Sequence, residues 1–167
     1  MFNNLDFTDP RETTGLNFSN ELQNRVLMFL ISQKPFGSIM SKNDVYDYAR
    51  MTDGMAANEL IYASRNYDFW LRIQCPELNL GEIKEFVLVE IETSKLPIVD
   101  IDLLKEEVKK EYRDLVEKYK ALTQQTGMYP PLIYYEEENI ILDGNHRAKA
   151  LQELGYKMIT VFKAIKR

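Results

Sequence analysis

The chain has 167 residues, 45% apolar and 28% charged, a balance typical of a globular protein rather than a disordered or membrane-spanning one. Its formal net charge of −5 argues against broad, charge-driven binding to nucleic acid, and its one cysteine excludes an internal disulfide and a multi-cysteine zinc site. The N-terminus lacks the positive start and the long apolar run of a signal peptide, so we expect a cytoplasmic protein without a membrane segment.

Residues 1–85 predict a helical N-terminal subdomain. After a polar arm, apolar periodicity and capping residues favour short helices over three segments: 19–33, 41–51 and 55–64. Ser41 and Asp44 are spaced as in a capping box. Three short helices could form a helix-turn-helix DNA reader, but the third segment contains no Lys or Arg to reach bases or phosphates. A packing or partner-binding role for these N-terminal helices is therefore the preferred interpretation.

Residues 86–167 predict an α/β (α+β) domain with a small mixed sheet and packed helices. The expected elements are a strand, a long amphipathic helix ended by Gly127, a hairpin of two strands, a short helix ended by Gly155 and a last strand, over 86–92, 101–125, 132–135, 140–142, 148–154 and 158–162. Helices that alternate with strands in this order favour a sheet covered by helices.

The turn between the hairpin and the short helix holds the chain's only histidine. Asp143 and Gly144 end the strand, Gly144 lets the main chain approach a ligand, and Asn145 is placed to cap the helix. Unsatisfied N–H groups and the helix dipole favour an anion there, and the planar fork of Arg147 suits phosphate oxygens. The dipole biases His146 toward the neutral form, whereas a bound phosphate would favour its charged form. The alternative is an ordinary Asp-Gly turn with a solvated His-Arg pair.

Basic residues crowd the last twenty positions, close in sequence to this turn: Lys149, Lys157, Lys163, Lys166 and Arg167. An acidic protein with a locally basic pocket suits a small anion better than a nucleic-acid duplex.

Residues 86–163 resemble the ParB N-terminal/sulfiredoxin-like superfamily. The resemblance covers about half of the chain and rests on a strand leading to Leu96-Pro97, a helix ending at Gly127, the run Pro131-Leu132-Ile133, and the run from Leu142 to Ala150 closed by Gly155 and a strand. The string Asp-Gly-x-His-Arg-x-x-Ala, in this order of elements, is its most specific part.

The resemblance implies that the turn at residues 144–147 binds nucleotide phosphates, with His146 and Arg147 contacting them. The full set of expected phosphate-binding residues is Gly144, Asn145, His146, Arg147 and Lys149. Sulfiredoxins have their reactive cysteine where this chain has Asn145, which argues against sulfinic-acid repair. In CTP-hydrolysing partition proteins the turn reads Gly-Glu-Arg-Arg, and His146 here replaces the first of the two arginines.

The nearest match is to the Asp-Gly-His-His-Arg type, which includes nucleotide-dependent free-serine kinases. By that similarity Asp143 is the expected acidic participant in phosphoryl transfer, or a ligand for Mg²⁺, and Glu90 or Glu92 is its partner. His146 is expected to act with them at the transferred phosphoryl group.

The favoured function is therefore a protein that binds ATP, ADP or CTP with Mg²⁺ and acts as a phosphotransferase or phosphohydrolase. One alternative is a DNA-associated, ParB-like module of the nuclease or partition type, derived from a phage or a mobile element. The other is a non-catalytic protein that docks a protein partner through its N-terminal helices.

Overall fold

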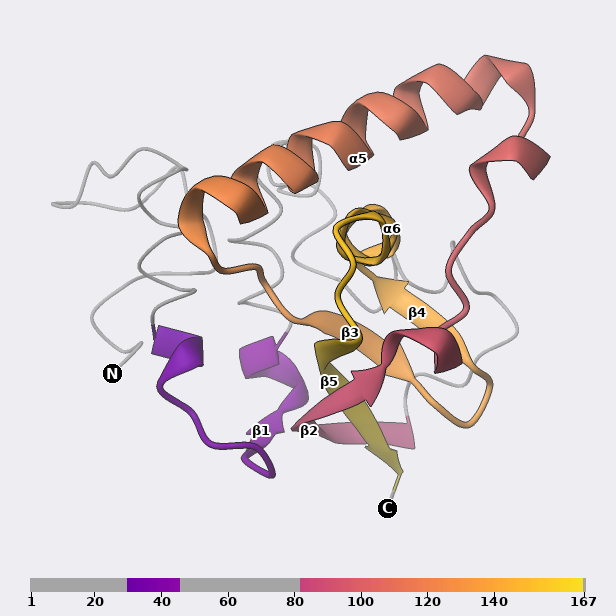
Figure 1. The fold of residues 1–167 in the computed structure, drawn as a ribbon. Coiled ribbons are helices and arrows are strands. Elements are labelled where there is room, and N and C mark those ends of the chain that lie inside the picture. The colour runs from indigo at the N-terminus through magenta and orange to yellow at the C-terminus, as the bar shows by residue number, and fades with distance from the viewer. Residues whose placement is uncertain (1–29, 46–81, 167) are drawn as a thin grey trace, which may run out of the picture. The chain divides into compact units, whose positions relative to one another are not determined.

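The structure, a computed structural model, describes residues 30–45 and 82–166, which are coloured in Figure 1. It divides the chain into two compact units, residues 1–86 with 165–167, and residues Val87–Ala164. The helices expected over 19–33 and 41–51 lie largely outside the described residues, and the one over 55–64 lies wholly outside them. Within those residues, 30–32 are helical, and the Asp44 backbone N–H donates to Ser41 Oγ at 3.2 Å, as the predicted capping box requires.

The described elements confirm a mixed α and β fold. Five strands form one sheet in the order β1-β2-β5-β3-β4, and they span Ile39–Ser41 (β1), Ile83–Glu92 (β2), Leu132–Tyr135 (β3), Ile140–Asp143 (β4) and Met158–Lys166 (β5). β3 pairs antiparallel with β4 and parallel with β5, so the sheet is mixed, as the sequence predicts. The predicted hairpin is confirmed, with an irregularity in its register between Ile133 and Tyr134.

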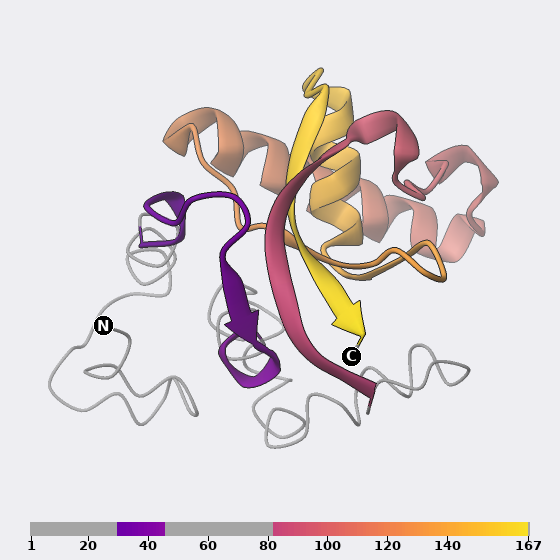
Figure 2. The same cartoon turned by 90° about the horizontal axis from the view of Figure 1, so that it is seen from below.

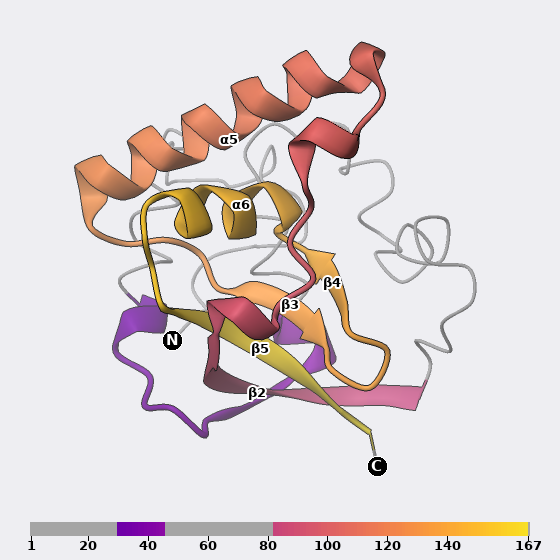
Figure 3. The same ribbon diagram turned by 45° about the vertical axis from the view of Figure 1, so that its right-hand side comes forward.

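The unit of residues 87–164 is built in layers, with the helix α6 (Asn145–Glu153) between the sheet and the helix α5 (Glu106–Thr126) (Figures 1 and 3). Seen from below, β2 and β5 lie in front of both helices (Figure 2). Ala148 and Leu151 pack α6 against the sheet, among buried side chains that include Leu132 and Ile159. Ala150 faces away from them and packs with Val116 of α5. A nine-residue helix is therefore buried on two faces, which fixes its position.

The long helix starts later than its apolar pattern predicts. Asp100 accepts a hydrogen bond from the Asp102 N–H at 3.0 Å and so caps a separate 3₁₀ turn, η6 (Ile101–Leu103). Leu104 and Lys105 are then extended, and α5 begins only at Glu106. The predicted start at residue 101 is therefore wrong. Asp100 caps a separate short turn, and the two extended residues after that turn delay the start of the α-helix. The predicted stop at Gly127 is confirmed: its φ is 68°, and its N–H donates to Thr123 O at 2.8 Å.

Both ends of α6 bear on the site. The helix begins at Asn145, the residue predicted to cap it, and three residues before its apolar period starts at Ala148, so His146 and Arg147 lie in its first turn. It ends as predicted beside Gly155, whose φ is 87°. The Gly155 N–H donates to Gln152 O and the Tyr156 N–H donates to Leu151 O, the paired bonds of a Schellman motif.

Candidate functional site

The candidate turn lies where β4 ends and α6 begins, with Gly144 as the N-cap residue. Asp143 is the last residue of β4 and lies on the same face of the sheet as Ile141, which packs under α6. The first bond of the helix runs from the Ala148 N–H to Gly144 O at 2.8 Å. The N–H groups of Asn145 and His146 precede that bond, so they find no acceptor within the helix.

Arg147 is buried in this turn and contacts protein groups. Its Nη2 lies 3.2 Å from Asp143 Oδ2, and the two side chains are only 6% and 9% exposed. Its Nη1 donates to the Pro130 carbonyl oxygen at 3.3 Å. The interpretation of a solvated His-Arg pair is therefore wrong for Arg147. The guanidinium ties the segment before β3 to the end of β4, and its charge is matched by Asp143.

Gly144 is required by both its conformation and its neighbours. Its φ of 98° is one that residues with a side chain rarely adopt. A Cβ built there would lie 2.6 Å from Leu132 Cδ2 and 2.9 Å from Arg147 Nη2. The sequence predicts that this glycine lets the main chain approach a ligand; in the structure, the groups that approach it are the guanidinium of Arg147 and a core leucine.

Asn145 does not cap the helix, so that prediction is wrong. Gly144 occupies the N-cap position with no side-chain cap bond, and Asn145 is the first helical residue. Its Nδ2 instead donates to Ile141 O at 3.3 Å, which anchors its side chain to β4. The first turn of α6 contains no acidic residue, so the positive end of the helix dipole is not offset by a carboxylate from that turn.

His146 packs against α5. Its ring centroid lies 4.2 Å from that of Tyr112, with 39° between the ring planes. Burial lowers the pKa of His146 and so does the nearby Arg147, whereas the charges of Asp143 and Glu111 oppose the shift. The imidazole is therefore kept neutral near pH 7, in line with the bias expected at a helix N-terminus.

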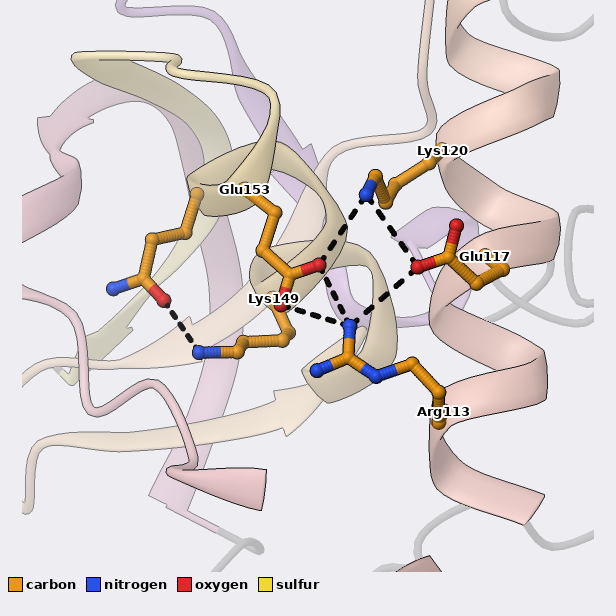
Figure 4. A network of polar contacts seen from close by, with 6 residues as sticks. Arg113, Glu117, Lys120, Lys149 and Glu153 are labelled. Carbon is orange, nitrogen blue, oxygen red and sulfur yellow. Dashed lines mark hydrogen bonds and ion pairs between the residues drawn. The ribbon is translucent and has the colours of Figure 1, made fainter. Parts of the chain in front are cut away.

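Lys149 lies one helical turn after Asn145, half-buried, with its Nζ donating to Gln152 Oε1 at 3.0 Å (Figure 4). Residues four apart on a helix are neighbours, so Lys149 and Asn145 share one side of α6 next to His146. The N-cap and the first five residues of α6 therefore contain all five predicted binding residues, Gly144, Asn145, His146, Arg147 and Lys149, and Asp143 precedes them at the end of β4.

Glu90 and Glu92 are not brought to this turn. They lie on β2, which β5 and β3 separate from β4, a distance of about 14 Å at the usual strand spacing. Val89 and Ile91 face α6, so Glu90 and Glu92 alternate to the other face of the sheet, where both are exposed. Across residues 30–45 and 82–166, moreover, no three His, Cys, Asp or Glu side chains gather in a way that could hold a metal ion.

Tyr112 is the neighbour of the site that the sequence analysis misses. Its spacing marks it as one of the apolar residues of α5, but only the packing of α5 on α6 shows that it meets His146. Its Oη is buried and has no hydrogen-bond partner among the described residues. The ring that carries this orphaned hydroxyl therefore packs on the only imidazole of the chain.

Charged residues of α5 also contact α6. Arg113 Nη1 lies 2.7 Å from Glu153 Oε1, and Lys120 Nζ lies 3.4 Å from the same oxygen (Figure 4). These contacts are at the opposite end of α6 from His146.

No family model matches the chain, and comparisons with curated proteins and with solved structures gave no significant match. In the part of the chain that the structure describes, no helix has the length and apolar character needed to cross a membrane.

Proposed function

We propose that this chain binds the phosphate groups of a nucleotide at the N-terminus of α6, with the His146 imidazole and the Lys149 ammonium as the side-chain groups that contact them. The observation that carries the proposal is the start of α6: no side-chain cap, no acidic residue in the first turn, and a histidine in that turn. Backbone N–H groups and the helix dipole favour an anion at such a position. The resemblance to the ParB N-terminal/sulfiredoxin-like superfamily supports the same ligand class.

In this proposal Arg147 positions the turn and does not contact the ligand. Its guanidinium is held by Asp143 and by the Pro130 carbonyl, so it fixes Gly144 and the first residues of α6 in place. Rigid support of this kind keeps binding groups in their productive geometry. Asp143 acts here as the partner of Arg147, and no catalytic or metal-binding role is assigned to it.

The proposal is restricted to binding, because the acidic residues expected to serve phosphoryl transfer do not meet at the turn. Glu90 and Glu92 lie on the far face of the sheet, and Asp143 is paired with Arg147. The DNA-associated and partner-docking alternatives depend on the N-terminal helices, most of which lie outside the described residues, so we do not propose either of them.

The test is thermal unfolding of the full chain with ATP, ADP, CTP and pyrophosphate, each with and without Mg²⁺. A ligand at a hundred times its Kd stabilises the native state by about 2.7 kcal/mol, or about 5–10 °C for a chain of this size. Pyrophosphate shows whether the phosphates alone are enough.

Two variants and a matched control assign the site. His146→Phe keeps a ring beside Tyr112 without its nitrogens, and Lys149→Gln removes one charge; each should weaken binding about ten-fold or more, the value of one charge-assisted hydrogen bond. Lys110→Gln changes a lysine that is 88% exposed on α5 and should leave binding unchanged. The absence of stabilisation by every ligand, or stabilisation equal in all three variants, would refute the proposal.

A further inference from the structure

One face of α6 points at α5, formed by residues spaced four and three apart: His146, Ala150 and Glu153. Ala150 and Val116 are fully buried where the helices meet. On one side of this apolar centre His146 packs on Tyr112, and on the other side Glu153 contacts α5 (Figure 4). An ionisable side chain of α6 therefore lies on each side of the contact.

The His146 side is built for a neutral ring. The imidazole is half-buried at the positive end of α6, next to the buried guanidinium of Arg147. The negative groups around it are Glu111 on α5 and Asp143 on β4, and the Asp143 carboxylate is also the counter-charge of Arg147. Tyr112 offers a ring and a hydroxyl that stays protonated, because burial raises the pKa of Tyr112.

The Glu153 side is built for a charged group. Arg113 Nη1 donates to both oxygens of Glu153, at 2.7 and 2.9 Å, and Lys120 Nζ donates to Oε1 at 3.4 Å. Burial by itself would raise the pKa of Glu153, but these hydrogen bonds and charges outweigh it and lower the pKa. Glu153 therefore stays ionised, and bound to α5, at a pH where a histidine takes up a proton.

We propose that the contact between α5 and α6 is a proton-operated joint: uptake of a proton by His146 releases the Tyr112 side, while the Glu153 side keeps α5 attached. An imidazolium needs water or a counter-charge, and it gains water when Tyr112 moves off its ring. The Tyr112 hydroxyl gains as well, because water supplies the hydrogen-bond partner that it lacks among the described residues. The joint needs no ligand, so it does not depend on the proposed nucleotide site.

Proton NMR of the full chain in phosphate-free buffer tests the joint, because a single histidine gives a single set of imidazole signals. The titration midpoint should lie below pH 6.5 in the native protein and return to about 6.5 in urea. Tyr112→Ala should move the native midpoint toward 6.5, whereas Glu153→Gln should leave it unchanged. A native midpoint at or above 6.5, or equal shifts in the two variants, would overturn the proposal.

Amide hydrogen exchange then shows whether the joint opens. After correction for intrinsic exchange, protection around Tyr112 and in the first turn of α6 should fall at least ten-fold between pH 7.5 and pH 5.5, while protection around Lys120 stays constant. His146→Phe, which cannot take up a proton, should abolish this pH dependence. An equal loss of protection in that variant, or no loss in the wild-type chain, would refute the opening.

Discussion

Removing one partner of the buried Asp143–Arg147 pair should destabilise the chain more than the loss of a contact alone would. The two side chains are 6% and 9% exposed, and 3.2 Å separates Arg147 Nη2 from Asp143 Oδ2. In Asp143→Asn the guanidinium remains buried with its charge but without its counter-charge. In Arg147→Met the Asp143 carboxylate likewise remains buried with its charge but without its counter-charge.

The expected magnitude follows from this burial. Breaking a buried ion pair by removing one partner costs about 3–5 kcal/mol, since an uncompensated charge remains. We expect about 3 kcal/mol for Asp143→Asn, because Arg147 keeps the Pro130 carbonyl at 3.3 Å, and about 4 kcal/mol for Arg147→Met. The double variant buries no charge and should lose only about 3–4 kcal/mol instead of the sum of about 7 kcal/mol, so the two changes should be coupled by about 3–4 kcal/mol.

Urea unfolding followed by circular dichroism at pH 7 measures these free energies. The matched control is Lys110 and Asp114, which are also four residues apart with 3.1 Å between Nζ and Oδ2 but are 88% and 65% exposed. Lys110→Gln and Asp114→Asn should each change stability by less than about 0.5 kcal/mol. Single losses below about 1 kcal/mol at Asp143 and Arg147, or losses that simply add in the double variant, would refute the assignment of a buried and coupled pair.

Three further predictions concern the same layer of the fold. Gly144→Ala should lower the free energy of unfolding by about 3 kcal/mol or more, because a strained φ adds to a Cβ placed 2.6 Å from Leu132 Cδ2. Gly155→Ala, with open space around it, should lower it by only about 1–2 kcal/mol. Equal losses in urea unfolding would contradict this difference. Tyr112→Phe should leave stability unchanged or raise it by up to about 1 kcal/mol, because it removes a buried hydroxyl that has no partner among the described residues; a loss above 1 kcal/mol would show that the hydroxyl is satisfied. Burial lowers the pKa of His146 in the native state. Between that lowered pKa and about pH 6.5 the unfolded chain therefore binds more protons than the native chain, and the free energy of unfolding should fall as the pH is lowered. The same pH dependence of stability in His146→Phe would show that His146 is not its cause.

What the sequence predicts correctly is what short-range chemistry determines. Gly127 and Gly155 adopt the left-handed conformation expected of helix-ending glycines. The hairpin of β3 and β4 forms where two apolar runs flank a turn, which closes with the Asn139 N–H donating to Glu136 O at 3.0 Å. Each of these features depends on residues that are close together in the chain.

What the sequence does not predict depends on tertiary packing. The burial of Arg147 requires the Pro130 carbonyl from a separate segment, and no local pattern distinguishes it from a solvated arginine. Tyr112 meets His146 only because α5 crosses α6 at Ala150. Packing brings Tyr112 of α5 to the site and keeps Glu90 and Glu92 of β2 away from it, and the order of residues along the chain does not encode that packing.

The helix α6 is too short to form without the layers that pack against it. An isolated helix of nine residues is not stable in water, because nucleation is unfavourable and few bonds follow it. Its geometry is imposed by the sheet on one face and by α5 on the other. A peptide that contains residues 140–157 should therefore show no helical circular dichroism. The turn can therefore hold an anion only while α6 is packed between the sheet and α5, and its conformation should be lost when either of them separates from α6.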